Sequence, residues 1–266
     1  MQKRKKKIYT IIILLLANLF LSSYIFFDKN GEIAFLNVGQ GDSELIRTKE
    51  GQIVLIDGGP TAQVLEELGK ELPYWDKTID LVILSHPHAD HLVGLNYVAK
   101  KYKIKKVIEG SKASDTPEYK TWQNIKKQKN IPTVRLSKGS RIILSKNESM
   151  DVLWPEKNYD DKDLNNDSLV INFTAEGKKY LFTGDAGSKV LEKIGEKLKA
   201  DYLKVPHHGS KTALTQKALS DINPKKAIIE VGENSYGHPA QSILGLLKKN
   251  RIPYFLTLNG SQFLYY

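Results

Sequence analysis

The chain has 266 residues, a formal net charge of +10, 41% hydrophobic and 26% charged residues, and no cysteine. This length and balance are typical of a globular domain, and they exclude wholesale disorder and a membrane protein with many spans. Without cysteine there are no disulfides, zinc–cysteine sites or thiol nucleophiles, which leaves His, Asp and Glu as the strong metal ligands. Residues 1–30 hold six Lys or Arg and one Asp, so half of the net charge lies there and the remainder of the chain is mildly basic.

The N-terminus combines a basic segment, Met1–Lys7, with an apolar run, Ile8–Phe27. About 20 apolar residues are enough for a spanning helix, and no small-residue cleavage site stands near the end of this run. The pattern predicts one N-terminal transmembrane helix within residues 1–30 that acts as an uncleaved signal anchor in the cell membrane. The basic end would lie in the cytoplasm and residues 31–266 would lie outside. A cleaved signal, which would make the protein secreted, is the alternative.

After this segment, β-branched runs alternate with amphipathic helical stretches, which predicts one α/β domain over residues 31–266. In the first half we expect strands at 33–38, 43–48, 53–56, 79–84, 105–108 and 133–136, and helices at 61–72, 92–102 and 117–130. In the second half we expect strands at 142–144, 152–154, 168–173, 179–182, 202–205, 226–231, 254–258 and 262–265, and helices at 188–198, 215–222 and 239–250. Two sheets covered by helices on the outside account for this order.

The strongest chemical signal lies between a predicted buried strand and a helix, where the sequence reads Ser-His-Pro-His-Ala-Asp-His. It supplies three of the six histidines and one carboxylate: His86, His88, Asp90 and His91. A tight turn can point these side chains to one place. Imidazole nitrogen and carboxylate oxygen bind borderline metals such as zinc, and this spacing can supply two ions. We therefore favour a metal site over helix-capping polar residues.

Two further segments follow predicted strands far away in the sequence. Asp185 ends one of them, and the pair His207 and His208 ends another. Each alone is typical of a turn or a surface pair, but together with the first cluster they complete a site for two divalent ions. His238 precedes a predicted helix, where it could meet an anion together with free backbone N–H groups or simply cap the helix.

These motifs resemble the metallo-β-lactamase superfamily, whose fold is a four-layer αββα sandwich with the metals at one edge. The resemblance spans about residue 32 to the C-terminus and rests on His86-x-His88-x-Asp90-His91, with Asp57 upstream and Asp185 downstream. The segments 36–43, 165–171, 207–210 and 236–239 are similar to the extracellular hydrolase domain of ComEC competence proteins. Those proteins are channels that take up DNA, and their hydrolase domain is considered a nuclease.

One superfamily feature is missing, because no histidine lies between His91 and His207 to serve as the common third motif. Asn166 or Ser168 could contribute weakly there or leave one position open. A site with fewer imidazoles and more oxygen ligands shifts the preference from zinc toward manganese or magnesium.

The resemblance implies hydrolysis with two divalent metal ions, zinc or manganese. His86, His88 and Asp185 would hold the first ion, and Asp185 would bridge to the second. The second ion would be held by Asp90, His91, Asp185 and one of His207 and His208.

Other residues would act around the metals. Asp90 would also accept the proton of the attacking water, and Asp57 would orient a ligating histidine. Three residues are candidates for gripping or protonating a phosphate: His238, Ser210 and Lys211.

The leading hypothesis is a membrane-anchored, extracytoplasmic nuclease or phosphodiesterase, with DNA as a candidate substrate and a permease as a candidate partner. A cell-envelope phosphodiesterase, such as a teichoic-acid phosphocholine esterase, and a non-catalytic metal-binding module are the alternatives. A nuclease should bind DNA in a salt-sensitive way, and an envelope esterase should not. Two lysine clusters could serve that binding: Lys103, Lys105 and Lys106, and Lys126, Lys127 and Lys129.

Overall fold

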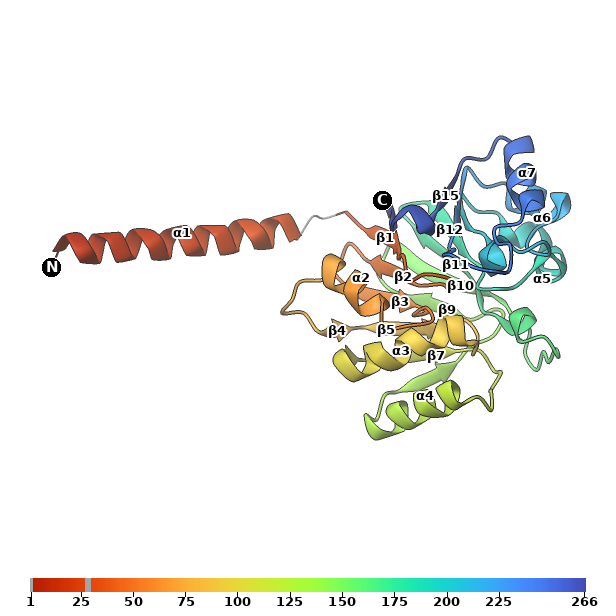
Figure 1. The fold of residues 1–266 in the computed structure, drawn as a ribbon, viewed down its shortest axis with the longest axis horizontal. Coiled ribbons are helices and arrows are strands. Elements are labelled where there is room, and N and C mark those ends of the chain that lie inside the picture. The colour runs from red at the N-terminus through yellow and green to blue at the C-terminus, as the bar shows by residue number, and fades with distance from the viewer. Residues whose placement is uncertain (1, 27–29) are drawn as a thin grey trace.

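The computed structural model describes residues 2–26 and 30–266, with side chains described for residues 5–18 and 30–266. Two seven-stranded sheets pack face to face, and helices cover the outer face of each (Figure 1). The architecture is the αββα sandwich that the sequence predicts. The two sheets bury an apolar layer between them, and a second and a third apolar layer lie under the two groups of helices.

The first sheet has the strand order β16-β1-β2-β3-β5-β7-β8. Its strands are β1 (Glu32–Phe35), β2 (Glu44–Arg47), β3 (Ile53–Ile56), β5 (Leu81–Leu84), β7 (Val107–Glu109), β8 (Thr133–Arg135) and β16 (Gln262–Tyr265). Helices α2 (Val64–Glu71), α3 (Ala89–Lys101) and α4 (Pro117–Gln128) cover it, and β4 (Thr78–Ile79) pairs with β6 (Lys103–Ile104) at its rim. Strands β1 to β3 form an antiparallel meander, whereas β3, β5, β7 and β8 run parallel. All residues of β3 and β5 are buried, as expected of parallel strands covered on both faces.

The second sheet has the order β15-β14-β13-β12-β11-β10-β9. Its strands are β9 (Arg141–Ile143), β10 (Glu148–Trp154), β11 (Val170–Ala175), β12 (Lys178–Phe182), β13 (Tyr202–Lys204), β14 (Lys226–Ile229) and β15 (Tyr254–Leu256). Its helices are α5 (Ser188–Ile194), α6 (Gln216–Ile222) and α7 (Gln241–Lys249), and four 3₁₀ turns lie between elements: η1 (Leu164–Asp167), η2 (Gly195–Leu198), η3 (Pro206–Gly209) and η4 (Thr257–Asn259). Strands β12 to β15 are parallel. The hairpin of β11 and β12 turns at Glu176 and Gly177, as predicted, and both residues have positive φ.

One feature of the fold was not predicted from the sequence, and another differs from the prediction. The last strand, β16, returns to the first sheet and pairs antiparallel with β1, so that Gly31 and Tyr266 exchange two backbone hydrogen bonds of 3.1 and 3.0 Å. The last helix begins at Gln241 rather than at Pro239, because Ala240 is extended (φ −64°, ψ 140°) and its N–H donates to the carbonyl of Gly209. His238 therefore does not stand at the start of this helix.

Helix α1 (Gln2–Phe26) lies on the side of the sandwich where β1 begins (Figure 1). Its side chains from Ile8 to Leu16 are exposed. Across the described residues, no helix has the length and hydropathy that a membrane crossing requires. The remainder of the apolar run, residues 19–27, lies outside the described side chains, and the predicted membrane anchor stays a prediction.

Candidate metal centre

The predicted ligands gather at one edge of the sandwich because they follow the carboxyl ends of neighbouring strands. Strand β5 leads into residues 85–91, β12 leads into Asp185, and β13 leads into His207 and His208. The carboxyl ends of parallel strands share an edge of their sheet, and the two sheets present these ends at the same edge of the sandwich. Loops separated by more than a hundred residues therefore deliver side chains to one place.

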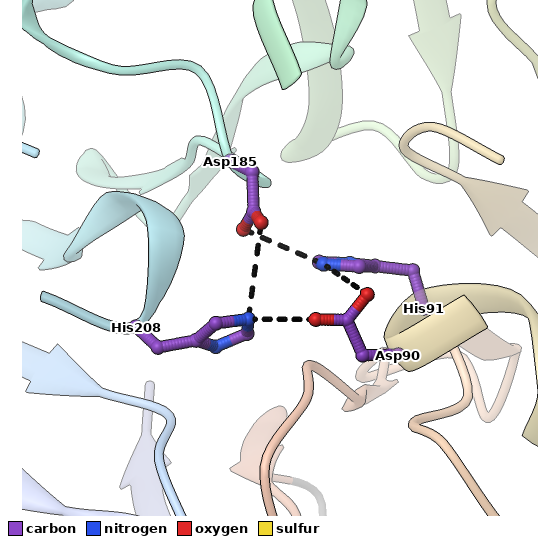
Figure 2. Close-up of side chains that lie close together, drawn as sticks. All are labelled: Asp90, His91, Asp185 and His208. Carbon is purple, nitrogen blue, oxygen red and sulfur yellow. Dashed lines mark hydrogen bonds and ion pairs between the residues drawn. The ribbon is translucent and has the colours of Figure 1, made fainter. Parts of the chain in front are cut away.

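Four side chains form the centre: Asp90, His91, Asp185 and His208 (Figure 2). One ligand atom of each lies within 4.8 Å of the others. Nε2 of His91 lies 3.4 Å from Oδ1 of Asp185, and Nε2 of His208 lies 3.2 Å from Oδ2 of Asp90. The side chain of Asp90 is 35% exposed, whereas the other three are at most 2% exposed. Solvent thus reaches the centre on the side of Asp90.

Unpaired buried atoms show that this centre suits a cation. Nε2 of His86, Nε2 of His91 and Oδ1 of Asp185 are buried without a hydrogen-bond partner. An unpaired buried polar atom is costly, so a native protein normally gives it a partner. Imidazole nitrogens and carboxylate oxygens together are a donor set for a divalent transition metal. The residues present therefore fit such an ion.

His86 and His88, the first two histidines of the motif, lie beside these four residues. The ring centroid of His86 is 4.2 Å from that of His91 and 4.7 Å from that of His88. Burial, followed by the charge of His91, holds the pKa of His86 well below its ordinary value. His86 is therefore neutral, which is the form that binds a metal.

The two adjacent histidines of η3 diverge. Both have positive φ, 49° for His207 and 51° for His208, and their ring centroids are 6.1 Å apart at an interplanar angle of 76°. His208 points into the centre, while His207 is 30% exposed and its Nε2 lies 3.8 Å from Oδ2 of Asp185. The geometry thus brings His208 among the central ligand atoms and leaves His207 at their margin.

His238 lies next to this pair, with its ring 5.6 Å from that of His207 and 6.3 Å from that of His208. Asn234 holds it there: the Asn234 side chain donates to the His238 carbonyl (2.8 Å) and accepts from the His238 N–H (3.1 Å). Burial, and then the charge of His207, lower the pKa of His238. Its Nδ1 is buried without a partner, so this ring can bind a further group at the margin of the centre.

Asp57 orients His91. Its Oδ2 lies 2.7 Å from Nδ1 of His91, and its Oδ1 accepts the backbone N–H of Ser85 at 2.8 Å. The Ser85 hydroxyl donates to Oδ2 at 2.5 Å. Because Nδ1 of His91 donates to Asp57, Nε2 is the nitrogen that faces Asp185, and it offers a lone pair once its own proton is displaced. This contact is the one expected of Asp57 from the sequence.

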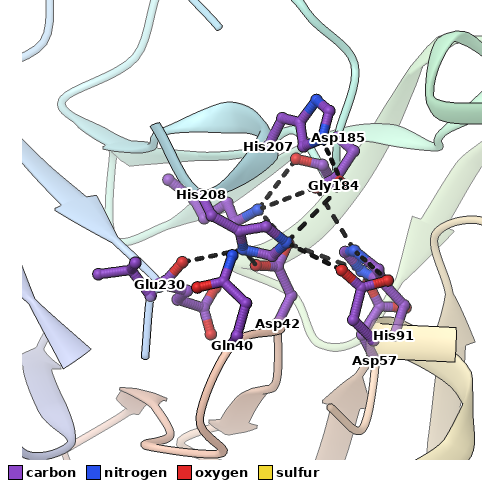
Figure 3. Close-up of polar contacts among 12 residues, drawn as sticks. Gln40, Asp42, Asp57, His91, Gly184, Asp185, His207, His208 and Glu230 are labelled. Atoms are coloured by element: carbon purple, nitrogen blue, oxygen red, sulfur yellow. Dashed lines mark hydrogen bonds and ion pairs between the residues drawn. The ribbon is translucent and has the colours of Figure 1, made fainter. Parts of the chain in front are cut away.

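The sequence prediction missed a buried charged network under the centre, formed by Asp42, Lys204 and Glu230. Figure 3 labels Asp42 and Glu230 beside His208. Nδ1 of His208 lies 2.9 Å from the carbonyl oxygen of Glu230 and 3.2 Å from Oδ1 of Asp42, so its Nε2 faces the centre. The Lys204 ammonium contacts the carboxylate of Asp42 and donates to the carbonyl of Gly184 at 2.9 Å. Burial opposes its charge, but Asp42 and Asp185 outweigh burial and raise the pKa of Lys204.

Gly41 allows Asp42 to reach this position. A Cβ at residue 41 would lie 2.3 Å from the carbonyl oxygen of Asp90. The next backbone N–H, that of Asp42, donates to the same carbonyl at 3.3 Å. Only glycine permits this approach, and the segment 36–43 thus acts in the site although it carries none of the predicted ligands.

The other residues predicted for the site have separate roles. The Ser168 hydroxyl accepts the backbone N–H of Asp185 at 3.2 Å and so helps to position that carboxylate. Asn166 is not among the central ligand atoms, and its backbone carbonyl accepts from the Trp154 indole at 2.7 Å. Ser210 is buried and bonds to Thr212 at 3.2 Å. Lys211 is exposed beside it.

Protons compete for the same nitrogens as a metal. Burial disfavours charge on His208, but Asp185 and Asp42 outweigh burial and raise its pKa to about 10. Asp185 and Asp57 similarly raise the pKa of His91 against the effect of burial. Burial raises the pKa of Asp185, but His91 and then His208 outweigh it and hold that pKa well below its ordinary value. The centre therefore carries strong negative charge that a cation or protons must neutralise.

Residues 36–232 match the metallo-beta-lactamase superfamily. With the fold and the His/Asp centre at the carboxyl ends of the strands, this match shows that the chain belongs to that superfamily, whose fold binds divalent metals. It is a metallo-beta-lactamase superfamily hydrolase related to competence proteins.

The chain is 30% identical over 249 residues to ComE operon protein 3 of Bacillus subtilis (strain 168). The matched region covers 84% of this chain and 31% of that protein. It is 26% identical over 248 residues to the competence protein ComA of Neisseria gonorrhoeae, covering 88% of this chain and 32% of ComA. The chain therefore spans about a third of the length of these relatives. Igni18, a metallo hydrolase from the archaeon Ignicoccus hospitalis, superposes with a TM-score of 0.58 at 16% identity over 88% of this chain and 98% of its own, which shows a shared fold.

Proposed function

We propose that this chain is a membrane-anchored, extracytoplasmic, metal-dependent phosphodiesterase that cleaves DNA. The observation that carries the proposal is the centre of Asp90, His91, Asp185 and His208, in which Nε2 of His91 and Oδ1 of Asp185 are buried without a hydrogen bond. The similarity to proteins named for competence favours DNA as the substrate. The basic and apolar order of residues 1–27 favours an anchor with the sandwich outside.

In this proposal the ligands divide between two ions, zinc or manganese. His86, His88 and Asp185 would hold one ion, and Asp90, His91, Asp185 and His208 would hold the other. Divalent ions at such a site supply Lewis acidity and lower the pKa of water that attacks phosphorus.

Asp90 is the general base of this proposal because it is the most exposed carboxylate of the centre. Burial raises its pKa, but His91 and then the hydrogen bond from His208 outweigh burial and lower it, so Asp90 is ionised and can accept a proton. The oxygen of the attacking water forms a new bond to phosphorus and one water proton passes to Asp90. The P–O bond to the leaving group breaks with its electron pair on the leaving oxygen, which takes up a proton from solvent.

The rings of His238 and His207 lie 5.6 Å apart, and in this proposal both bind a phosphoryl oxygen of the substrate. Because its pKa is lowered, His238 is neutral near pH 7 and serves as a hydrogen-bond donor rather than as a cation. Ser210 and Lys211 follow Gly209, two and three residues after His208, and would contact the neighbouring part of a polyanion.

The test uses the full chain, purified in detergent, with bound metal measured by elemental analysis. Fluorescent single-stranded and double-stranded DNA and a bis-aryl phosphodiester are assayed with zinc, with manganese and with a chelator. We expect metal-dependent cleavage of DNA and of the small diester, and loss of both activities in His88→Ala. Asp151→Asn, which changes an exposed ion pair on β10, is the control and should retain activity.

The outcomes separate the hypotheses. Cleavage of the small diester without cleavage of DNA would reject the nuclease and favour a cell-envelope phosphodiester, such as phosphocholine on teichoic acid. Stoichiometric metal without turnover of any diester would favour a non-catalytic metal-binding module.

A further inference from the structure

The loop between α2 and β4 displays two large aromatic side chains to solvent. Tyr74 is 80% exposed and Trp75 is 55% exposed, and their rings stack edge to face with centroids 4.9 Å apart. The chain has three tryptophans, and the other two, Trp122 and Trp154, are fully buried. Tyrosine and tryptophan with one apolar end and one polar end are enriched where a protein meets a bilayer surface.

A basic hollow adjoins this loop. It has a volume of about 730 Å³ and is lined by five lysines and no carboxylate: Lys77, Lys101, Lys103, Lys105 and Lys129. The ammonium of Lys77 lies 5.2 Å from the centre of the Tyr102 ring, and the N–H of Lys103 donates to the carbonyl of Lys77 at 2.7 Å. The loop and the hollow are therefore parts of one ordered surface.

Acidic groups also lie beside this surface: Glu71 ends α2 just before the aromatic loop, and Glu50, Asp76 and Asp80 line a neighbouring hollow together with Lys103 and Lys105. Asp80 accepts from Lys105 at 2.6 Å and from the N–H of Ile53 at 2.8 Å, and Asp76 accepts the N–H of Thr78 at 3.0 Å. Of the five lysines, Lys129 caps α3 by donating to the carbonyl of Ala99 at 2.5 Å. The lining of the hollow itself holds lysines and no carboxylate, which suits an anionic partner.

The surface lies at the edge of the first sheet where parallel strands begin, opposite the edge that carries the metal centre. Lys77 precedes β4 and β5, Lys105 precedes β7, and Lys129 precedes β8. Strand β1 begins at this edge as well. Glu32 pairs with Arg47, whose guanidinium donates at 2.5 Å to the carbonyl of Glu71, the last residue of α2 before the aromatic loop. Figure 1 shows α1 leaving the sandwich on this side.

We infer that this surface, made of the Tyr74–Trp75 loop and the adjoining hollow with its five lysines, docks on a bilayer that contains anionic phospholipid. Helix α1 precedes β1, which begins at this same edge. The exposed apolar side chains of α1 between Ile8 and Leu16 favour an apolar surrounding. Lysines at the membrane surface are attracted by anionic headgroups, and the two aromatic rings would enter the interface. Docking in this way turns the metal centre away from the membrane, toward a polymer that approaches from outside.

A nucleic acid is the other polyanion that could fill the hollow. Its backbone would then run along the edge opposite the metal centre, where it could not reach Asp90, and it would leave the aromatic loop and the exposed face of α1 unexplained. The inference does not depend on the proposed hydrolysis. It shares with the proposed function only the association of the N-terminal segment with a membrane.

The fluorescence of Trp75 tests the docking in the full chain, because the other two tryptophans are buried. The chain is reconstituted into vesicles of brominated phosphatidylcholine, alone or in an equal mixture with phosphatidylglycerol. We expect bromine to quench Trp75 in the mixed vesicles, and we expect added salt to reverse the quenching. Trp75→Phe should leave a residual fluorescence that brominated lipid does not change.

A triple variant, Lys77→Gln, Lys101→Gln and Lys103→Gln, should abolish the quenching while the protein still floats with the vesicles. The matched triple, Lys120→Gln, Lys157→Gln and Lys248→Gln, removes three exposed lysines elsewhere and should quench like the parent chain. Three outcomes would overturn the docking alone. In the first two, brominated lipid would fail to quench Trp75 in a chain that floats with the vesicles, or would quench it equally in vesicles without phosphatidylglycerol. In the third outcome, single-stranded DNA rather than lipid would change the fluorescence of Trp75. A chain that does not float would overturn both the docking and the anchor, while hydrolysis of a soluble diester is measured separately.

Discussion

The carboxylate of Asp57 and the imidazole of His91 form a 2.7 Å contact that decides which nitrogen of His91 faces the metal centre. Asp57 also accepts two hydrogen bonds from Ser85, one from its N–H and one from its hydroxyl. These bonds fix the carboxylate, which in turn fixes the ring. The strand end that carries Asp57 thus orients a histidine supplied by another strand end.

Replacement of this carboxylate should weaken metal binding. In Asp57→Asn, the side chain has one acceptor oxygen in place of two and cannot serve both Ser85 and His91. We expect a loss of metal affinity of about 10- to 100-fold, as found when a partner of a metal-bound histidine is removed. Calorimetric titration of metal into the metal-free variant and into the metal-free parent chain measures the two affinities. Asp80→Asn, at the opposite edge, is the control, and equal losses in both variants would contradict the role of Asp57.

The adjacent histidines should differ in their contribution to metal binding. His208→Ala removes a central nitrogen and leaves Asp90 and Asp185 without it, so most metal should be lost on dialysis. His207→Ala removes a marginal ring and should retain metal while it weakens substrate binding. Elemental analysis and KM measurements separate the two effects. Loss of metal in His207→Ala together with retention of metal in His208→Ala would show that His207, and not His208, is the metal ligand.

Metal affinity should rise with pH. The pKa of His208 is raised to about 10 and that of His91 is raised as well, so both are protonated in the metal-free chain at neutral pH. A metal must displace these protons, and the affinity should increase by about tenfold per pH unit for each proton released. Titrations in buffers of different ionisation enthalpy count the protons. An affinity that is constant between pH 6 and 9, roughly the range below the His208 pKa, would contradict this reasoning.

Two buried lysines offer a matched comparison of stability. Lys204 pairs with Asp42 under the centre, and Lys126 pairs with Glu109 under α4. Conversion of either lysine to Met removes the ammonium that pairs with a buried carboxylate and should cost about 3–5 kcal/mol of unfolding free energy. Saturating metal should restore part of the loss in Lys204→Met, because the ion brings positive charge near Asp42 and Asp185. It should restore none in Lys126→Met, and urea unfolding with metal or with chelator shows the difference.

Two helical glycines should respond in opposite ways to alanine. A Cβ at Gly94 in α3 would lie 1.7 Å from the carbonyl oxygen of Gly58, so Gly94→Ala should destabilise the fold by about 1–3 kcal/mol or more. Gly69 in α2 has open space around it, and Gly69→Ala should stabilise the chain by roughly 0.5–1 kcal/mol. Thermal unfolding measures both variants, and a tolerated Gly94→Ala would mean that α3 can shift away from Gly58.

The sequence predicts those parts of the site whose signal is local. One apolar run is followed at once by four candidate ligands, His86, His88, Asp90 and His91. This order can be recognised in the sequence without knowledge of what the side chains contact in the fold. The parallel strand order then explains why Asp185 and His208 join them. Their clustering, and the sandwich itself, therefore agree with what the pattern indicates.

The network of Asp42 and Lys204 could not be predicted in the same way. Asp42 follows a glycine, a pattern that is typical of an ordinary turn. Lys204 is a single charged residue at the end of a short predicted strand. Their contact joins positions 162 residues apart, so neither side chain shows its partner in its own neighbourhood. The one local hint is that Lys204 lies between Leu203 and Val205, both fully buried. The pairing of β16 with β1 escaped prediction for the same reason.

That pairing also makes the first sheet dependent on residues made long after its other strands. Until Gln262–Tyr265 have left the ribosome, β1 presents an open edge with unpaired N–H and C=O groups, which can recruit another chain. Closing a loop of nearly the whole sandwich is entropically costly, so β16 should add late in folding. Protection of the open edge of β1 during synthesis is therefore a requirement that this topology places on the cell.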